Sequence, residues 1–215
     1  MPAAPAAARP ARVTAVCVGR AEPIGPARRA SPEQARPDGV RSAIRKQAVS
    51  TPSDPVRVEL APTGLWGDEQ ADLTVHGGPD KAVYAYPAEH YAFWASVRAQ
   101  ARVPAPLAPG ALGENLLIEG LGETQLWIGD VLRIADAQLR VTAPRAPCWK
   151  LDAAMGFSWA AKMMAQSGFT GYYLSVVRAG SIAAGDEVLV LPGDRVLSVA
   201  QRHAMKHRNR QPSLF

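Results

Sequence analysis

The sequence predicts a mostly β fold with a few helices, in which the strands form a closed or half-closed barrel. Short extended runs are separated by Gly or Asp turns, a pattern typical of barrels. The 18 Gly and 19 Pro residues are scattered without a period, which indicates many turns. A chain of 215 residues with 47% hydrophobic content can bury one proper core, which excludes a disordered or fibrous protein.

The first half of the chain contains three expected strands and one helix. Residues 12–18 alternate small and β-branched side chains, and a proline-rich loop follows through residue 39. Residues 56–60 alternate more clearly and predict a strand with one exposed face, and residues 82–86 predict another. Pro87 and Glu89 predict a helix start, because proline suits the first turn and an acid suits its positive end. We expect this helix to continue to about residue 100 and to bury Tyr91, Trp94 and Val97.

The second half contains more strands and one further helix. Four short extended runs, at residues 116–118, 125–128, 131–134 and 139–142, lie between Gly or Asp turns. Residues 151–166 are apolar at helical spacing and end before Gly168, a plausible C-cap. Residues 172–177 and 187–191 are expected to complete the sheet. Two Gly-Asp pairs, at residues 129–130 and 185–186, each precede a Val/Leu strand.

The expected organisation is a flexible tail at residues 1–11, one domain at 12–192, and a C-terminal helix or tail at 193–215. Two cysteines, Cys17 and Cys148, have no disulfide or zinc spacing, which indicates a reducing compartment and a cytoplasmic location. The proline-broken N-terminus lacks the apolar core of a secretory signal, and no stretch is long and apolar enough to span a membrane.

The net charge of +5 and the isoelectric point near 9.5 invite a nucleic-acid interpretation. Much of the excess, however, lies at residues 202–210, and basic tails of this kind are usually solvated. There is no groove-binding motif and no stripe of interleaved aromatic and basic residues. We therefore expect no nucleic-acid polymer as a partner, and a cationic pocket for a small anion explains the remaining charge equally well.

Cys148 lies in the segment Pro-Arg-Ala-Pro-Cys-Trp-Lys at residues 144–150. A thiol beside fixed positive charge favours its thiolate, the form that attacks or ligates. Arg145 and Lys150 supply that charge, so Cys148 is a candidate nucleophile or metal ligand. The alternative is a small hydrophobic residue at a strand end.

Three other segments carry residue types suited to anions or polar rings. The turn at residues 76–81 places His76 and Lys81 around two glycines whose N–H groups can face an anion. The alternative is a tight turn in which His76 only caps a loop. Ser42, Arg45 and Lys46 suit a phosphate or are simply solvated, and Glu114 with Asn115 suits a heterocycle or satisfies backbone groups. Their joint occurrence with the Cys148 segment favours one shared pocket.

Four ordered motifs, at residues 64–72, 76–86, 113–116 and 144–151, resemble the MOSC domain family, and within it the YiiM-type 6-N-hydroxylaminopurine resistance proteins. The resemblance runs from about residue 43 to residue 190. It implies a barrel-like fold similar to the β-barrel domain of pyruvate kinase. It also implies binding of the molybdenum cofactor, a pterin with a phosphate.

By resemblance, Cys148 is the protein ligand to molybdenum, which is sensible for a soft thiolate. The implied activity is reduction of N-hydroxylated purines and other hydroxylamines to amines. Arg145 and His76 are then the residues that steer the substrate oxygen or supply protons, with Cys148 as the third catalytic residue. The implied cofactor-binding residues are Ser42, Arg45, Lys46, His76, Lys81, Glu114, Asn115 and Arg145.

The chain has no dinucleotide-binding fingerprint and no cysteine cluster for iron–sulfur centres, so electrons are expected from an external donor protein. An alternative is a cofactor- or sulfur-carrier module with a persulfide on Cys148; the lack of a pyridoxal-phosphate domain counts against a complete cofactor sulfurase. A monomer and a homodimer both remain open. The sequence departs from the family at residues 142–143, which are Thr-Ala where relatives often have Ser-Gln, and after residue 190, where relatives carry a three-helix domain.

Overall fold

The computed structural model describes residues 10–25, 39–73, 77–103 and 106–208, with the side chains of 207–208 left out. Its strands are β1 (Arg12–Val18), β2 (Glu22–Pro23), β3 (Arg41–Ser42), β4 (Gln47–Ser50), β5 (Val58–Ala61), β6 (Gly64–Leu65), β7 (Val83–Pro87), β8 (Leu116–Glu119), β9 (Val131–Ile134), β10 (Ala137–Pro144), β11 (Tyr172–Arg178), β12 (Gly180–Ile182) and β13 (Val188–Leu191). Its α-helices are α1 (Tyr91–Gln100), α2 (Trp149–Met155), α3 (Ala160–Ser167) and α4 (Val199–Arg208). Short 3-10 turns, η2 (Pro79–Lys81) and η3 (Ala88–His90), flank β7. The predicted mostly β fold class is confirmed.

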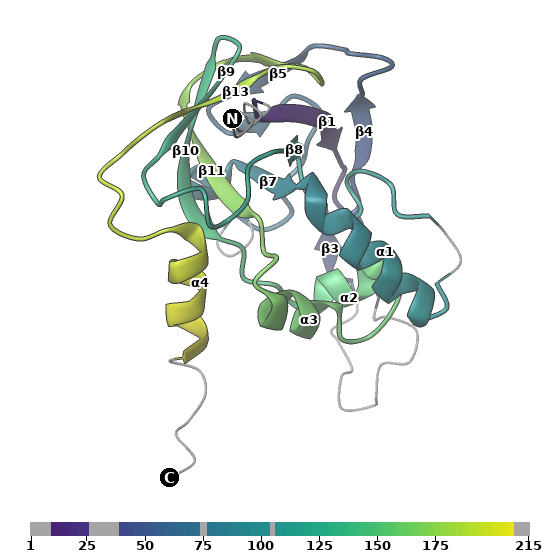
Figure 1. Ribbon diagram of the computed structural model, residues 1–215. Coiled ribbons are helices and arrows are strands. Elements are labelled where there is room, and N and C mark those ends of the chain that lie inside the picture. The colour runs from purple at the N-terminus through teal and green to yellow at the C-terminus, as the bar shows by residue number, and fades with distance from the viewer. Residues whose placement is uncertain (1–9, 26–38, 74–76, 104–105, 209–215) are drawn as a thin grey trace, which may run out of the picture.

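The main sheet has eight strands in the order β13-β9-β10-β11-β7-β8-β1-β4. All neighbouring pairs are antiparallel except β7 and β8. The sheet curls until β13, at one end, meets β1, the strand next to the other end: Val13 N donates to Asp186 O at 2.9 Å and Val188 N donates to Ala11 O at 2.8 Å. These bonds close the sheet into the expected barrel, which forms the upper part of the molecule in Figure 1.

Two apolar cores lie on opposite sides of β1, β7 and β8. Alternate residues such as Val83 and Ala85 face the barrel interior, while Tyr84 and Tyr86 between them face the helices. Because successive side chains of a strand point to opposite faces, these three strands bury one set of residues in each core. The helices gather at one end of the barrel (Figure 1), where Trp94 of α1 is fully buried. No helix in the described ranges is long and apolar enough to cross a membrane.

Two element predictions are wrong. The strand expected at 125–128 is a turn, because Asp130 accepts a hydrogen bond from Trp127 N at 3.1 Å and bends the chain. The helix expected at 151–166 is two helices, α2 and α3. Gly156 at φ 79° and Trp159 at φ 87° adopt left-handed conformations, which cannot continue a right-handed helix.

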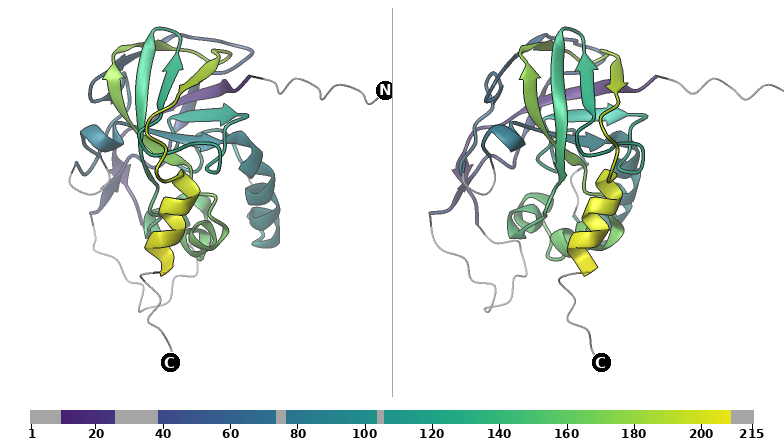
Figure 2. Two further views of the ribbon diagram at one scale, coloured as in Figure 1. Left: turned by 60° about the vertical axis from the view of Figure 1, so that its left-hand side comes forward. Right: turned by 90° about the vertical axis from the view of Figure 1, so that its left-hand side faces the viewer.

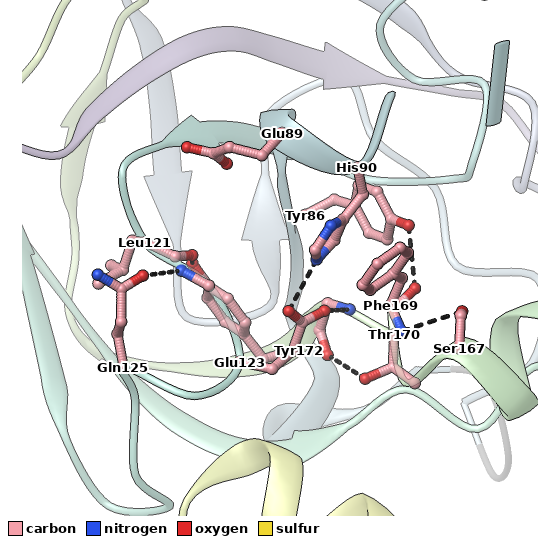
Figure 3. A network of polar contacts seen from close by, with 12 residues as sticks. Tyr86, Glu89, His90, Leu121, Glu123, Gln125, Ser167, Phe169, Thr170 and Tyr172 are labelled. Atoms are coloured by element: carbon pink, nitrogen blue, oxygen red, sulfur yellow. Dashed lines mark hydrogen bonds and ion pairs between the residues drawn. The ribbon is translucent and has the colours of Figure 1, made fainter. Parts of the chain in front are cut away.

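The connection from α3 back to β11 is fixed by a buried polar network (Figure 3). Glu123 accepts hydrogen bonds from His90 at 2.8 Å and from Gly171 N at 2.7 Å. The His90 ring stacks on Phe169 at 3.9 Å, and Tyr86 donates to the Phe169 carbonyl at 2.9 Å. The segment between α3 and β11 is therefore held against η3 and β7.

Candidate functional site

A cleft lies on the outer side of the barrel, where segments far apart in the chain come together. It encloses about 90 Å³. This is smaller than the usual ligand cavity, so it can enclose only one end of a cofactor-sized ligand. The side chains and backbone that line it come from Ser42, Ala43, Ile44, Lys46, Asp68, Glu69, Gln70, Ala71, Lys81, Ala82, Tyr84, Gly113, Asn115, Arg145, Ala146, Cys148, Lys150 and Tyr173.

Cys148 lies at the lip of this cleft, at the N-cap of α2. Its backbone is extended (φ −137°, ψ 175°), as is usual for an N-cap residue, and the helix begins at Trp149. Cys17 has a different environment: it is fully buried, and desolvation raises the pKa of its thiol. Cys17 is therefore a neutral core residue, and Cys148 is the cysteine available to a ligand.

Arg145 forms the inner wall of the cleft as a buried cation. Its guanidinium donates to the Leu112 carbonyl and lies 4.8 Å from the centre of the Tyr84 ring. Burial acts to lower the pKa of Arg145, but the neighbouring Tyr84 and Tyr173 hydroxyls raise it, and the net shift is upward. Arg145 therefore keeps its charge inside the cleft.

Two lysines add to this charge. Lys150 is only 8% exposed and lines the cleft, and no described residue forms a hydrogen bond or ion pair with it. Lys81 also lines the cleft, with its Nζ 5.8 Å from the centre of the Tyr173 ring. The printed ion pairs give the Lys150 ammonium no carboxylate partner among the described residues, so its charge can attract an anionic ligand to the cleft.

The Lys46 charge, in contrast, is neutralised within the protein. Lys46 forms an ion pair with Asp68, and both side chains are less than a tenth exposed. Asp68 also accepts hydrogen bonds from Gly19 N at 2.8 Å and from the Asn115 amide at 2.9 Å. Lys46 therefore builds the cleft wall rather than offering an unpaired cation to a phosphate.

Asn115 joins this wall to the barrel. Its side-chain amide donates to the Cys17 carbonyl at 3.2 Å and to Asp68, and its oxygen accepts from Tyr84 N at 3.1 Å. The amide is thus occupied by the protein itself, although Asn115 lines the cleft. Its arrangement supports the structural alternative for this residue.

The remaining predicted site residues are placed as follows. Ser42 lines the cleft and accepts a hydrogen bond from Ile44 N at 3.3 Å. Arg45 does not line it, because its side chain points to solvent. His76 lies outside the described residues. Glu114 does not line the cleft either, because its carboxyl is fully buried behind Gly113 and binds Tyr91 and the N–H groups of 110 and 112.

Burial raises the pKa of Glu114, although its hydrogen bonds from Tyr91 and Gly110 N–H act to lower it. The folded protein therefore binds this proton more tightly than the unfolded chain. The protonated Glu114 carboxyl therefore contributes to the free energy of unfolding. This contribution is fully present below the pKa of the unfolded chain, about 4.3, and is lost as pH rises through the pKa of the folded protein. We expect the unfolding free energy of the wild type, relative to Glu114→Gln, to decrease as pH rises above about 4.

Urea unfolding of both proteins at several pH values measures this difference. Glu119→Gln, at an exposed carboxyl, controls for the loss of one negative charge. A wild-type advantage that grew with pH would show that the folded state favours the Glu114 carboxylate.

Sequence reasoning did not select Asp68, Lys150, Tyr84 and Tyr173 as site residues. Asp68 and Lys150 lie inside the quoted motifs at 64–72 and 144–151, so their charge was a usable signal. Tyr84 and Tyr173 lie in strands, where the sequence pattern predicts that alternate side chains point to opposite faces but not what each face contacts. Their position at the cleft depends on the pairing of β7 with β11, which no local pattern specifies.

A comparison with protein families matches the MOSC domain to residues 72–189, more than half of the chain. Protein YiiM of Escherichia coli is 40% identical over 151 residues, which cover 70% of this chain and 64% of that protein. An uncharacterized Bacillus subtilis protein, YflK, is 43% identical over 134 residues, which cover 62% and 58%. The chain therefore spans less than two thirds of the length of either bacterial relative.

A protein of Gibberella moniliformis named "Reductase" is 34% identical over 158 residues, which cover 71% of this chain and 26% of that protein. Among solved structures, the crystal structure of YiiM from Geobacillus stearothermophilus aligns with a TM-score of 0.67 and 27% identity. The alignment covers 94% of this chain and 87% of that one. Both the fold and the motif-bearing region are thus shared with these proteins.

Proposed function

Because this chain belongs to the MOSC domain family, we propose that its cleft binds the molybdenum cofactor and that it reduces N-hydroxylated bases such as 6-N-hydroxylaminopurine to amines. The family and the reductase-named relative agree with an oxidoreductase role. The observation that carries the proposal is that Cys148 lines one cleft together with three cationic side chains, Lys81, Arg145 and Lys150.

The residues present fit this cofactor. In the described part of the chain, no three His, Cys, Asp or Glu side chains could hold a metal ion alone. A metal that arrives already bound by the sulfurs of a pterin needs only one further soft ligand, and the Cys148 thiolate is of that type. Lys81 and Lys150 suit the cofactor phosphate, and the Ser42 hydroxyl lines the same cleft.

The bound cofactor would supply two-electron chemistry coupled to transfer of an oxygen atom. The overall reaction is R–NH–OH + 2 e⁻ + 2 H⁺ → R–NH₂ + H₂O. Arg145 is suited to orient the departing oxygen, because contacts with the Leu112 carbonyl and the Tyr84 ring hold its guanidinium in one position. The two electrons come from an external donor protein.

A carrier role is the second candidate, because a persulfide on Cys148 would be an anion beside the same cations. The two candidates differ in what the purified protein contains. A carrier holds labile sulfur on Cys148 and has no turnover of its own, whereas the reductase holds metal and pterin together.

The test is to purify the protein from a host that makes molybdenum cofactor, and to measure molybdenum, pterin and labile sulfur per chain. We expect about one molybdenum and one pterin per chain, and reduction of 6-N-hydroxylaminopurine by dithionite-reduced methyl viologen. Absence of both from the protein, in a host where another molybdoenzyme is loaded, would exclude the reductase. Labile sulfur in their place would support the carrier.

A further inference from the structure

A second cavity lies between β10 and α4, outside the cofactor cleft. It has a volume of about 320 Å³ and is lined by Ala143, Pro144, Arg202, Met205 and Lys206. We call it the α4 groove. Figure 2 shows α4 in yellow below the barrel strands, and a hydrogen bond from His203 to the Ala165 carbonyl joins it to α3.

Helix α4 is fixed where it lies, so the groove is a persistent feature. Val199 at its start is fully buried, and its N–H donates to the Leu126 carbonyl at 2.9 Å. His203, one turn further, bonds through its Nε2 to the Ala165 carbonyl at 2.9 Å. The first turn of α4 is thus hydrogen-bonded at its start to the Leu126 carbonyl and at its end to the Ala165 carbonyl of α3.

The groove has an apolar floor and a cationic rim. Ala143, Pro144 and the 41% exposed Met205 form the apolar part. Arg202 and Lys206 are exposed, lie one helical turn apart, and have no ion-pair partner among the described residues. Like charges at this spacing weaken a helix, so the pair does not contribute to the stability of α4.

No acidic residue follows Asp194 in the sequence, so the segment that carries this rim has no internal counter-charge. An apolar centre with a charged rim is the usual composition of a protein docking surface. A nucleic-acid backbone would require a longer row of cations than these two, and it would gain little from the apolar floor. The complementary partner is therefore a protein face with carboxylates around an apolar centre.

The groove and the cofactor cleft share the end of one strand. Pro144 lines the groove and Arg145, the next residue, lines the cleft. Consecutive Cα atoms are about 3.8 Å apart, so a protein seated in the groove is separated from the cleft by little more than the thickness of β10. This short separation suits electron transfer.

We infer that the α4 groove docks the external electron donor, and that this donor is a small redox protein with an acidic face. The inference rests on the proposed reductase function. The donor delivers two electrons to the cleft for each N–OH bond cleaved, and the two protons come from solvent. Salt screening should weaken the docking, because exposed charges provide much of the attraction.

The test compares two ways of reducing the cofactor-loaded protein. Dithionite-reduced methyl viologen is a small cation that needs no docking surface. Flavodoxin and plant-type ferredoxin, reduced by NADPH through their reductases, are acidic donors. We expect Arg202→Glu with Lys206→Glu to lower kcat/KM for the acidic donors at least about tenfold and to leave viologen-driven turnover unchanged.

Two matched proteins complete the design. Arg12→Glu with Arg133→Glu makes the same change in net charge on exposed strand residues away from the groove, and it should behave as the wild type. Arg202→Lys with Lys206→Arg keeps the charge and should also behave as the wild type. Thermal unfolding of all variants verifies that the fold is retained.

Each failure has a distinct meaning. If the wild type turns over with viologen but with neither acidic donor, or if the groove reversal leaves donor-driven turnover intact, the docking inference is wrong. A loss of viologen-driven turnover in the groove reversal would also overturn it, because α4 would then support the cleft itself. If the loaded wild type has no viologen-driven activity, the proposed reductase function fails first.

Discussion

Cys148→Ser is expected to lower turnover of 6-N-hydroxylaminopurine by at least about a hundredfold, because loss of a ligand should exceed the 10–100-fold effects of ligand-supporting residues. A serine hydroxyl is a harder donor than a thiolate and stays protonated near neutral pH. The measurement is viologen-driven turnover together with the molybdenum content of each preparation.

Cys17→Ala is the matched control, because it removes the other thiol, which is fully buried and does not line the cleft. It should retain metal and activity even if its stability is slightly lower. Cys148→Ser should unfold at the same temperature as the wild-type protein without cofactor, because Cys148 is only partly buried at a helix cap. A Cys148→Ser protein that kept full turnover would show that this thiol is not the metal ligand.

Asn115→Leu is expected to lower the free energy of unfolding by about 4 kcal/mol. Leucine would leave the Tyr84 N–H, the Cys17 carbonyl and the Asp68 carboxylate without the Asn115 amide, and each buried polar group left unpaired costs about 1–3 kcal/mol. For a chain of this size, the melting temperature should fall by about 10 °C. Urea and thermal unfolding measure both quantities.

Gln100→Leu makes the same chemical change at the exposed end of α1. It should change the unfolding free energy by less than about 0.5 kcal/mol. An equally small effect at Asn115 would mean that water or a rearranged Asp68 replaces its hydrogen bonds, and that the amide remains available to a ligand.

Local sequence patterns predicted most strands of the main sheet, because alternation marks β1 and turn residues separate the later runs that form β8, β9 and β10. They did not predict β4, which forms one edge of that sheet. They failed where one distant contact decides the outcome. The 151–166 segment has helical spacing throughout, yet Asp152 accepts a hydrogen bond from Ala161 N at 2.8 Å across the break between α2 and α3. Nothing in apolar spacing marks Trp159 as a left-handed residue.

For the site, the motifs correctly suggested that distant segments share one pocket: Ser42, Lys81, Asn115 and Arg145 line the same cleft as Cys148. They did not predict which charges are neutralised. Lys46 and Lys150 are both buried lysines in quoted segments, and only the folded chain shows that Asp68 pairs with the first. Ion pairing across 22 residues depends on the barrel, so composition could not distinguish the two lysines.

The seam of the barrel, where residues 11–13 meet residues 185–188, has a consequence for biosynthesis. Folding dominated by contacts between distant residues is slow, since loop closure precedes the gain from pairing. The first strand leaves the ribosome long before its partner at the seam exists, so the barrel cannot close during most of translation. Tyr173, on the far wall of the cleft, also emerges late. Insertion of the proposed cofactor is therefore expected only after translation is nearly complete. Until then, the early strands of the nascent chain need protection.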